Sequence, residues 1–298
     1  MRNTCDVGAA GVKVLITGAD GQVGKLLCRS APANARVSAC SRALLDVGDE
    51  AAVRGRVREL RPDVIINAAA YTAVDRAEAE AEPAGRVNAL GPAYLAAAAG
   101  ETGARLIHIS TDFVFDGAAS TPYRPESPTN PLSMYGRTKR DGEQAVLSLL
   151  PARSVIVRTA WVYAAEGHNF LHTMLRLMRE RGAVRVVADQ VGTPTAAGPL
   201  AEALWRIAGT DVTGVHHWTD AGVASWYDFA VAIAEEAAAL GLMSPHVTVT
   251  PIATADYPTP ARRPAYSVLD KSSLRALGLE PVHWRRSLRA VLEEVQGA

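Results

Sequence analysis

The sequence has few cysteines, no excess charge of either sign, and no apolar run long enough to cross a bilayer. Cys5, Cys28 and Cys40 have no motif spacing, which favours a reducing, cytoplasmic setting and gives them no chemistry. Lysine plus arginine and aspartate plus glutamate number 31 each, so no basic field exists to hold a nucleic acid or an anionic membrane. The longest apolar stretches, 93–99 and 230–242, fall short of the ~20 residues of a membrane helix.

The chain has 298 residues, 48% hydrophobic and 21% charged, which predicts a globular protein of one or two lobes. Residues 1–11 lack the basic start and apolar core of a secretory signal, and we expect a loose tail there.

Short apolar runs alternate with helical patterns along the first half of the chain. We expect helices at 22–30, 50–60 and 88–100 and strands at 12–17, 36–40, 64–67, 105–110 and 154–159. This alternation predicts an α/β fold of the Rossmann type, with a doubly wound parallel sheet covered by helices on both faces.

After about residue 161 the alternation of strand and helix patterns becomes less regular, which predicts a smaller, mixed α/β substrate lobe. Expected there are helices at 169–181, 199–207 and 226–240 and a strand near 184–188. We predict a dinucleotide-binding domain over 12–165, with about 189–235 returning to it. The substrate lobe then comprises about 166–188 and 236–298.

Three glycines, Gly18, Gly21 and Gly24, lie between the first strand and the first helix, with Gln22 and Val23 completing the turn. Glycine lets the backbone turn tightly and approach a pyrophosphate, whose charge is met by free N–H groups at the helix N-terminus. The spacing is GxxGxxG rather than the commoner GxGxxG. The turn therefore predicts a dinucleotide site, although such turns are also found in purely structural roles.

Ser41 and Arg42 follow the second strand, where NAD-binding proteins place a carboxylate for the ribose 2′-hydroxyl. A basic residue there accommodates a 2′-phosphate, so we expect NADPH, with NADH less preferred. The alternative is that Arg42 is a solvated surface charge. Asp46 and Val47 come next and are candidates to flank the adenine.

Tyr135 and Lys139 are four residues apart, so on a helix they lie on one face, one turn apart. We expect Asn130 as the N-cap of that helix and Pro131 as its first residue. Tyr135 would be the proton donor of a reductase. An adjacent Lys139 ammonium would lower its pKa from the ordinary ~10 toward neutrality.

The segment 110–117 follows the fourth expected strand, at the edge where open α/β sheets bind their ligands. The Thr111 hydroxyl could polarise a substrate carbonyl beside Tyr135. The alternative is that Ser110 and Thr111 cap a turn.

Together these residues give the sequence a chain-long resemblance to the dTDP-4-dehydrorhamnose reductase family of extended short-chain dehydrogenases. The matching segments are 18–24, 67–78, 110–117, 135–139, 158–163, 189–195 and 263–270. The resemblance implies a cytoplasmic oxidoreductase that reduces the 4-keto group of dTDP-4-dehydro-L-rhamnose, the final step of dTDP-L-rhamnose synthesis.

It also implies roles for individual residues. Thr111, Tyr135 and Lys139 would form the catalytic triad. The cofactor path would be lined by Ala68, Ala69, Ala70 and Tyr71, and the dTDP-sugar by Val74, Asp112, Phe113, Trp161 and Asn169. Trp161 could instead be a core residue. Arg263 could contact the substrate diphosphate, with a solvated arginine as the alternative.

One position departs from the family. Some members carry a glutamate that helps to hold Mg²⁺ between subunits, and this chain has Leu26 there. We therefore expect no Mg²⁺ and a monomer or weak homodimer.

Several histidines are expected to have no functional role. His168 and His172 have the spacing of a helical zinc pair, but a third ligand is lacking in the sequence, so a metal site is not expected. His108, and His216 with His217, lie in apolar strands and are expected to be structural.

Three other activities are known for related folds. A sugar-nucleotide dehydratase needs an Asp-Glu pair where Asp112 is followed by Phe113, which disfavours it. A nucleotide-sugar 4-epimerase stays open because it shares the triad. A non-catalytic regulatory subunit of the methionine adenosyltransferase type is the third, and an intact triad argues against it.

Overall fold

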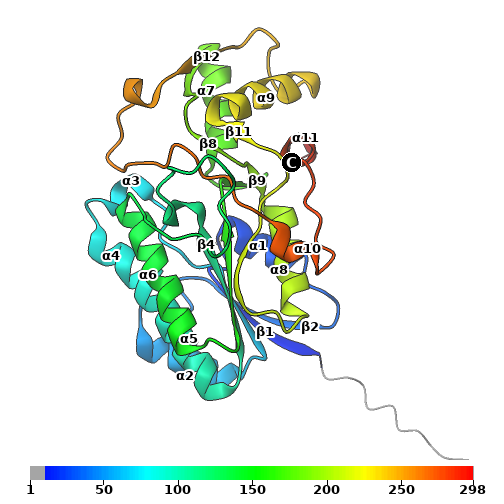
Figure 1. Cartoon of the computed structure of the whole chain (residues 1–298). Helices are drawn as coiled ribbons and strands as arrows, with labels where there is room; N and C mark the ends of the chain where they lie inside the picture. The colour runs from blue at the N-terminus through cyan, green and yellow to red at the C-terminus, as the bar shows by residue number, and fades with distance from the viewer. Residues whose placement is uncertain (1–10, 298) are drawn as a thin grey trace, which may run out of the picture.

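The computed structural model describes residues 11–297, so the loose tail expected at 1–11 lies outside the described part but for Gly11. Its centre is a six-stranded parallel sheet of order β10-β5-β4-β3-β1-β2 (Figure 1). The strands are β1 (Val12–Thr17), β2 (Ala35–Cys40), β3 (Val64–Asn67), β4 (Arg105–Thr111), β5 (Ser154–Thr159) and β10 (Gly214–His217). The expected Rossmann-type fold is confirmed.

Alternate residues of each central strand enter different cores. Val14 and Ile16 of β1 pack toward α1 (Gln22–Arg29) and α8 (Ala197–Ala208), in one hydrophobic cluster. Leu15 packs in the cluster on the other face, which is covered by α2 (Glu50–Leu60), α5 (Gly91–Thr102) and α6 (Met134–Leu149). A strand that is buried on both faces is mostly apolar, which explains Val64, Ile65 and Ile66 of β3.

Short elements connect the sheet to these helices. The chain from β3 to α5 passes through α3 (Val74–Ala77), α4 (Ala81–Gly85) and a π-helical turn, η1 (Arg86–Leu90). The 3-10 turn η2 (Asp112–Val114) follows β4 directly.

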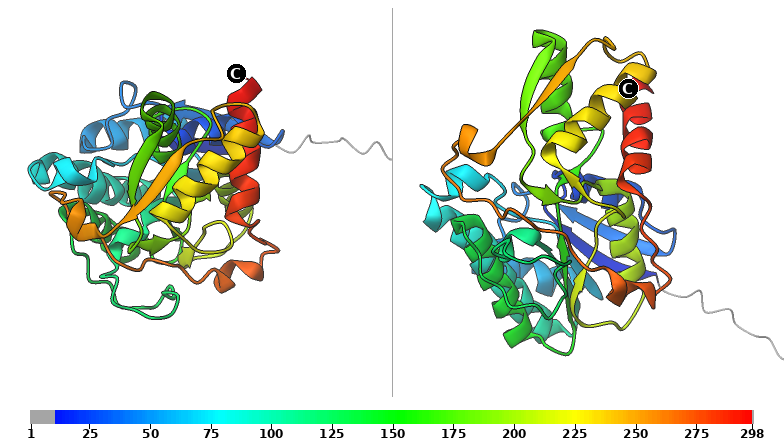
Figure 2. Two further views of the ribbon diagram at one scale, coloured as in Figure 1. Left: turned by 90° about the horizontal axis from the view of Figure 1, so that it is seen from above. Right: turned by 45° about the horizontal axis from the view of Figure 1, so that its top comes forward.

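A second lobe stands beyond the carboxyl ends of the strands (Figures 1 and 2). Its helices α7 (Phe170–Arg181), α9 (Trp226–Ala239) and α11 (Trp284–Gly297) share one hydrophobic cluster with the strand β7 (Ala183–Val187). Its remaining elements are β6 (Val162–Tyr163), β8 (Val191–Gly192), β9 (Thr195–Ala196), β11 (Ala224–Ser225), β12 (Thr248–Ile252) and η3 (Thr254–Asp256).

Two segments pack against the other lobe from the one that the sequence assigned them to. The first ten residues of α9 fall within 189–235, which the sequence assigned to the cofactor domain, yet Phe229 and Ile233 pack in the cluster of the second lobe. Conversely α10 (Ser272–Arg275) lies in the stretch assigned to the substrate lobe, but Leu274 packs with the sheet. We therefore propose a boundary that gives α9 to the substrate lobe and α10 to the cofactor domain.

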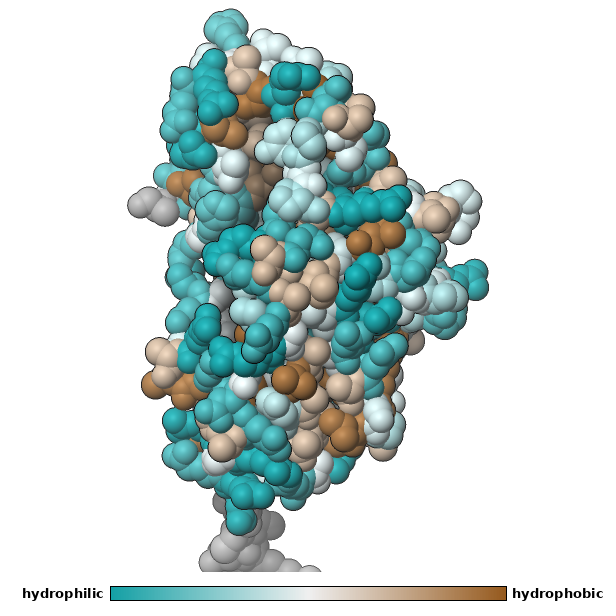
Figure 3. Space-filling view, turned by 90° about the vertical axis from the view of Figure 1, so that its left-hand side faces the viewer, coloured by the Kyte–Doolittle hydropathy of each residue, from teal (hydrophilic) through white to brown (hydrophobic). Residues whose placement is uncertain are grey.

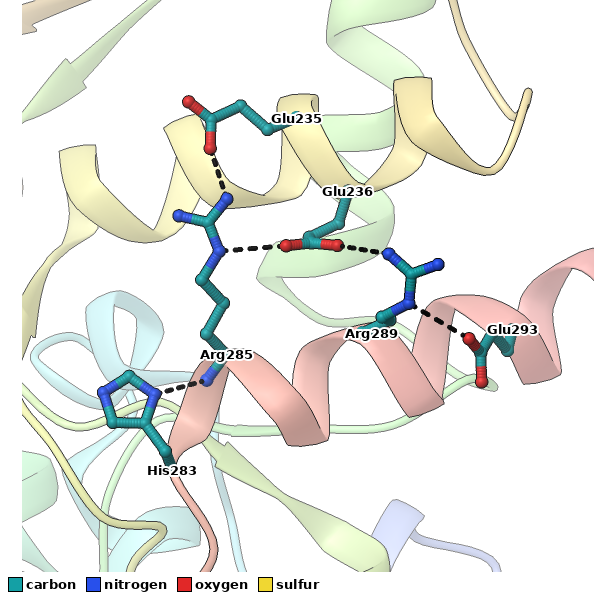
Figure 4. Close-up of polar contacts among 6 residues, drawn as sticks. All are labelled: Glu235, Glu236, His283, Arg285, Arg289 and Glu293. Carbon is teal, nitrogen blue, oxygen red and sulfur yellow. Dashed lines mark hydrogen bonds and ion pairs between the residues drawn. The ribbon is translucent and has the colours of Figure 1, made fainter.

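Charged residues join α9 to α11 at the surface (Figure 4). Glu236 accepts from Arg285 Nε at 2.9 Å and from Arg289 Nη1 at 3.1 Å, and Glu235 pairs with Arg285. Arg289 Nε also donates to Glu293 at 3.2 Å.

On the face drawn in Figure 3, hydrophobic residues are scattered among hydrophilic ones rather than gathered in one broad patch. Within residues 11–297, no helix combines the length and the apolar character needed to span a bilayer.

Candidate active site

A cavity of about 1150 Å³ lies where the carboxyl ends of the central strands meet the second lobe. Its lining includes most of the residues that the sequence singles out: Gly21, Gln22, Val23, Ala68, Ala70, Val74, Thr111, Asp112, Phe113, Tyr135, Lys139, Trp161, Asn169 and Arg263. The structure therefore brings the expected catalytic, cofactor and substrate residues around one space, although their roles stay predictions.

The glycine turn has the shape that a pyrophosphate requires. Gly18 has a φ of 67°, and a Cβ there would lie 2.6 Å from the Ala69 nitrogen. A Cβ on Gly24 would lie 2.2 Å from the Gly18 oxygen. Gly21 lines the cavity as the N-cap of α1, and among the described residues no side chain caps this helix end. These residues fit a dinucleotide, since Gly21, Gln22 and Val23 line the cavity at this uncapped helix start.

The residues expected around the adenosine lie outside the cavity. Arg42 is exposed just after β2. Asp46 accepts from the Gly48 N–H at 2.9 Å and forms an ion pair with Arg86 at 3.3 Å. Val47 is buried. The roles of Ser41, Arg42, Asp46 and Val47 stay predictions.

Asn88, which the sequence did not single out, holds the loop after β3. Its Oδ1 accepts from the Tyr71 N–H at 2.8 Å, and its Nδ2 donates to the Tyr71 carbonyl at 3.0 Å. The Tyr71 hydroxyl donates to Glu80 at 2.5 Å. This fixes the course of residues 68–71, of which Ala69 and Tyr71 lie outside the cavity.

The helix that carries Tyr135 begins later than expected. Asn130 and Pro131 are predicted as N-cap and first residue, and this is wrong. The N-cap is Ser133, whose Oγ accepts from the Gly136 N–H at 3.2 Å. Asn130 is held instead by the loop after β4, where its N–H donates to the Val114 carbonyl at 2.9 Å. A nonlocal contact therefore overrides a good local capping signal.

Tyr135 lies against Phe113, with ring centroids 5.6 Å apart in an edge-on arrangement. Desolvation raises the pKa of Tyr135 to about 12; a hydrogen bond with Thr111 opposes the rise, and the Asp112 charge adds to it. Among the described residues, these are the causes of the shift, whereas the sequence predicted a lowering by Lys139. A phenol with this pKa keeps its proton at neutral pH, as a proton donor must.

Lys139 is buried, with 2% of its surface exposed. Its Nζ donates to the Ile109 carbonyl at 2.6 Å and lies 3.4 Å from His108 Nε2. Burial lowers the pKa of Lys139 to about 8, and the Glu143 charge opposes this.

Thr111 and Asp112 are buried at the end of β4. Thr111 Oγ1 donates to Asp112 Oδ1 at 3.1 Å and accepts from the Phe113 N–H at 3.2 Å. Burial raises the pKa of Asp112 to about 6, against hydrogen bonds from Ser267 and Thr111. Thr111 therefore caps the turn, and it also lies beside Tyr135, while its catalytic role stays a prediction.

Trp161 has a φ of 49°, a conformation rare for a bulky residue and characteristic of functional sites. Its ring stacks on Trp226 with centroids 3.6 Å apart and planes 6° apart, and both residues line the cavity. A Cβ on Gly192 would lie 2.7 Å from the Trp161 ring. Trp226 was missed because no local pattern predicts a pair 65 residues apart.

Asn169 and Arg263 are both engaged with other side chains. Asn169 caps α7 by accepting from the His172 N–H, and its Nδ2 donates to Gln22 Oε1 at 2.8 Å. Both Nη atoms of Arg263 bind the Asp75 carboxylate, at 3.0 and 2.8 Å. Asp75 thus holds the guanidinium at the cavity wall, and a contact from Arg263 to a diphosphate stays a prediction.

Comparison with known proteins gives consistent matches. The model of the RmlD substrate binding domain family matches residues 12–297. A dTDP-4-dehydrorhamnose reductase of Aggregatibacter actinomycetemcomitans is 42% identical, covering 94% of this chain and 98% of its own length.

Solved structures agree with these matches. A dTDP-4-dehydrorhamnose reductase of Clostridium acetobutylicum has a TM-score of 0.91 and 41% identity, covering 96% of this chain and 100% of its own. A dTDP-4-dehydrorhamnose reductase of Bacillus anthracis, solved in complex with NADP, has a TM-score of 0.90 and 36% identity. The match covers 95% of this chain and 99% of the Bacillus anthracis chain.

Proposed function

The chain belongs to the RmlD substrate binding domain family, with the dTDP-4-dehydrorhamnose reductases, and we propose that it reduces the 4-keto group of dTDP-4-dehydro-L-rhamnose to give dTDP-L-rhamnose, using NADPH. This reaction completes dTDP-L-rhamnose synthesis. The observation that carries the proposal is the convergence of Thr111, Tyr135 and Lys139 on one cavity at the end of β4. NADPH agrees with the NADP complex of the Bacillus anthracis relative.

The cofactor supplies the hydride for C4 of the sugar when it is bound. The chain's own residues bind it at the glycine turn, where Gly21, Gln22 and Val23 face the cavity. The loop end of β3, with Ala68 and Ala70, forms the adjoining wall.

Tyr135 donates its proton to the C4 oxygen as negative charge develops there. Thr111, which lines the cavity beside Tyr135, orients the carbonyl oxygen next to the phenol. Lys139 lies one turn along α6. Its ammonium form, with a pKa of about 8, is a stronger acid than the phenol, so it returns a proton to the Tyr135 phenolate and regains one from solvent.

The second lobe contributes the sugar nucleotide site. Trp161 and Trp226 present a stacked pair of apolar faces at the cavity, which suits a deoxysugar or a base. Val74, Asp112 and Phe113 form the wall on the side of the cofactor domain.

The test is to mix the purified protein with dTDP-4-dehydro-L-rhamnose and NADPH, follow the absorbance of the reduced nicotinamide, and identify the product by NMR. Stoichiometric oxidation with formation of dTDP-L-rhamnose supports the proposal. Binding of both ligands without oxidation of NADPH contradicts it and favours the epimerase reaction, which consumes no external reductant.

A further inference from the structure

Four buried polar side chains form a row behind the active site: Thr17, Asn67, His108 and Lys139. They come from β1, β3, β4 and α6, and at most 2% of each is exposed. Thr17 is the register partner of Asn67, and Asn67 that of His108. Successive polar atoms lie 2.7, 3.0 and 3.4 Å apart. The row begins inside the sheet and ends at the Lys139 amino group.

The orientation of the Asn67 amide is fixed by its neighbours. The Ala69 backbone N–H, which can only donate, lies 3.1 Å from Asn67 Oδ1, and the Thr17 hydroxyl donates to the same oxygen. The other atom of the amide is therefore the nitrogen, and it faces His108 Nδ1 at 3.0 Å. Since an amide nitrogen only donates, His108 Nδ1 is the acceptor.

This contact determines the tautomer of His108. Burial, reinforced by the Lys139 charge, holds the pKa of His108 well below its usual range, so the ring is neutral. A neutral imidazole carries one proton, and with Nδ1 accepting, that proton is on Nε2. Nε2 is the atom that faces Lys139 Nζ.

A neutral amine has a lone pair that can accept the Nε2–H, whereas an ammonium has none and meets it donor to donor. We propose that His108 is a positioning residue, which presents Nε2–H to Lys139 and shifts that side chain from the ammonium toward the amine. This role replaces the structural one that the sequence favours for His108.

Other ionisable groups on the elements around Lys139 act differently. Glu143, one turn along α6, favours the ammonium but is engaged with Arg158 of β5 at 2.7 and 2.9 Å. Tyr135 of α6 and Asp112 of η2 lie on the cavity side. Among the described residues, His108 is thus the ionisable group that faces Nζ from within the sheet, beside the Ile109 carbonyl that accepts from Nζ at 2.6 Å.

The kinetic consequence rests on the proposed function. A Lys139 ammonium that is destabilised by the Nε2–H of His108 gives up its proton more readily. It therefore returns a proton to the Tyr135 phenolate after each turnover. Without the oriented His108, the amino group would hold its proton to higher pH.

The first test needs neither substrate nor activity. The protein is labelled with ¹⁵N in its histidine rings, and the His108 signals are identified by their loss in His108→Phe. We expect the neutral tautomer with the proton on Nε2, unchanged between pH 6 and about 9. A proton on Nδ1, or an imidazolium, would overturn the inference whether or not the protein is a reductase.

The second test reverses the donor and acceptor roles of the two His108 ring nitrogens. In Asn67→Asp the carboxylate still accepts from Thr17 and Ala69 but now also accepts from His108 Nδ1–H, so Nε2 becomes an acceptor that favours the ammonium. We expect the basic limb of the kcat/KM profile, and the NMR titration of Lys139 Nζ, to move up by about one pH unit.

The matched control is the same substitution in His108→Phe, where the new carboxylate acts by charge alone. In this background, the upward shift of the Lys139 titration should be less than half of the shift seen when His108 is present. If the Lys139 titration moves up equally with and without His108, the imidazole ring does not carry the effect of the Asn67 substitution. That result would refute the role of His108. The NMR titration gives this result even if the protein reduces no keto sugar.

Discussion

The side-chain amide of Asn169 donates to Gln22 Oε1 at 2.8 Å, and so joins the start of α7 to the glycine turn at the start of α1. One residue belongs to the substrate lobe and the other to the predicted cofactor site. The contact therefore connects the two binding regions directly.

Gln22→Met removes this contact while Asn169 still caps α7. We expect a several-fold rise in KM for both ligands and little change in stability. Asn169→Ala loses the cap as well, so the free energy of unfolding should also fall by about 0.5–2 kcal/mol. Steady-state kinetics and denaturant unfolding measure the two effects. Equal loss of stability in both variants would contradict this division of roles.

Arg42→Ala tests the predicted contact with the 2′-phosphate of NADPH. A charge-assisted hydrogen bond contributes about 1.5–3 kcal/mol, so affinity for NADPH should fall roughly 10- to 100-fold. Affinity for NADH should hardly change. The control is Arg181→Ala, another exposed arginine, at the end of α7. Titration of cofactor fluorescence measures both constants, and equal weakening of NADPH and NADH would show that Arg42 is only a surface charge.

Asp112 should make stability depend on pH. Burial raises its pKa to about 6, above the ~3.9 of an unfolded aspartate. The native state then binds the proton more tightly, so this residue's contribution to stability falls as pH rises from about 4 to about 6. Asp112→Asn keeps an oxygen acceptor for Thr111 and removes the charge.

The gain in Tm of Asp112→Asn over the wild type should therefore be larger at pH 8 than at pH 4. Thermal unfolding at the two values gives the comparison. A gain that is the same at both, or larger at pH 4, would mean that the carboxyl is not buried in the charged form at pH 8.

Glu236 connects two arginines of α11 to α9 (Figure 4). Because both arginine partners of Glu236 are about half-exposed, Glu236→Gln should lower the free energy of unfolding by only about 1 kcal/mol, and less at high salt. Glu293→Gln, which loses one contact on α11 itself, is the control and should cost less. An effect of Glu236→Gln that is unchanged in 1 M salt would exclude an ionic origin.

Local patterns predicted most of the cofactor domain. The bounds of β3, β5 and α2 agree with the sequence because a run of apolar residues or a helical period extends over only a few neighbouring residues. Asn130 failed as an N-cap because a hydrogen bond to Val114 holds it in a loop. Capping residues compete with nonlocal partners that a local pattern cannot show.

The finer features of the candidate site depend on contacts across the chain. Trp226 stacks on Trp161, and Asn88 holds Tyr71, across 65 and 17 residues. The predicted lowering of the Tyr135 pKa rested on the Lys139 charge alone, whereas both groups are desolvated. Residue types and spacing predicted residues that line one cavity, while burial determines their proton affinities.

Turnover of Tyr135→Phe shows whether Tyr135 is the proton donor of a keto-sugar reduction. With dTDP-4-dehydro-L-rhamnose and NADPH, we expect kcat to fall by about 10²-fold or more, as on loss of a general acid, while cofactor affinity and Tm stay near the wild-type values. The exposed Tyr257→Phe should be fully active. A Tyr135→Phe variant that turns over at close to the wild-type rate would contradict the account.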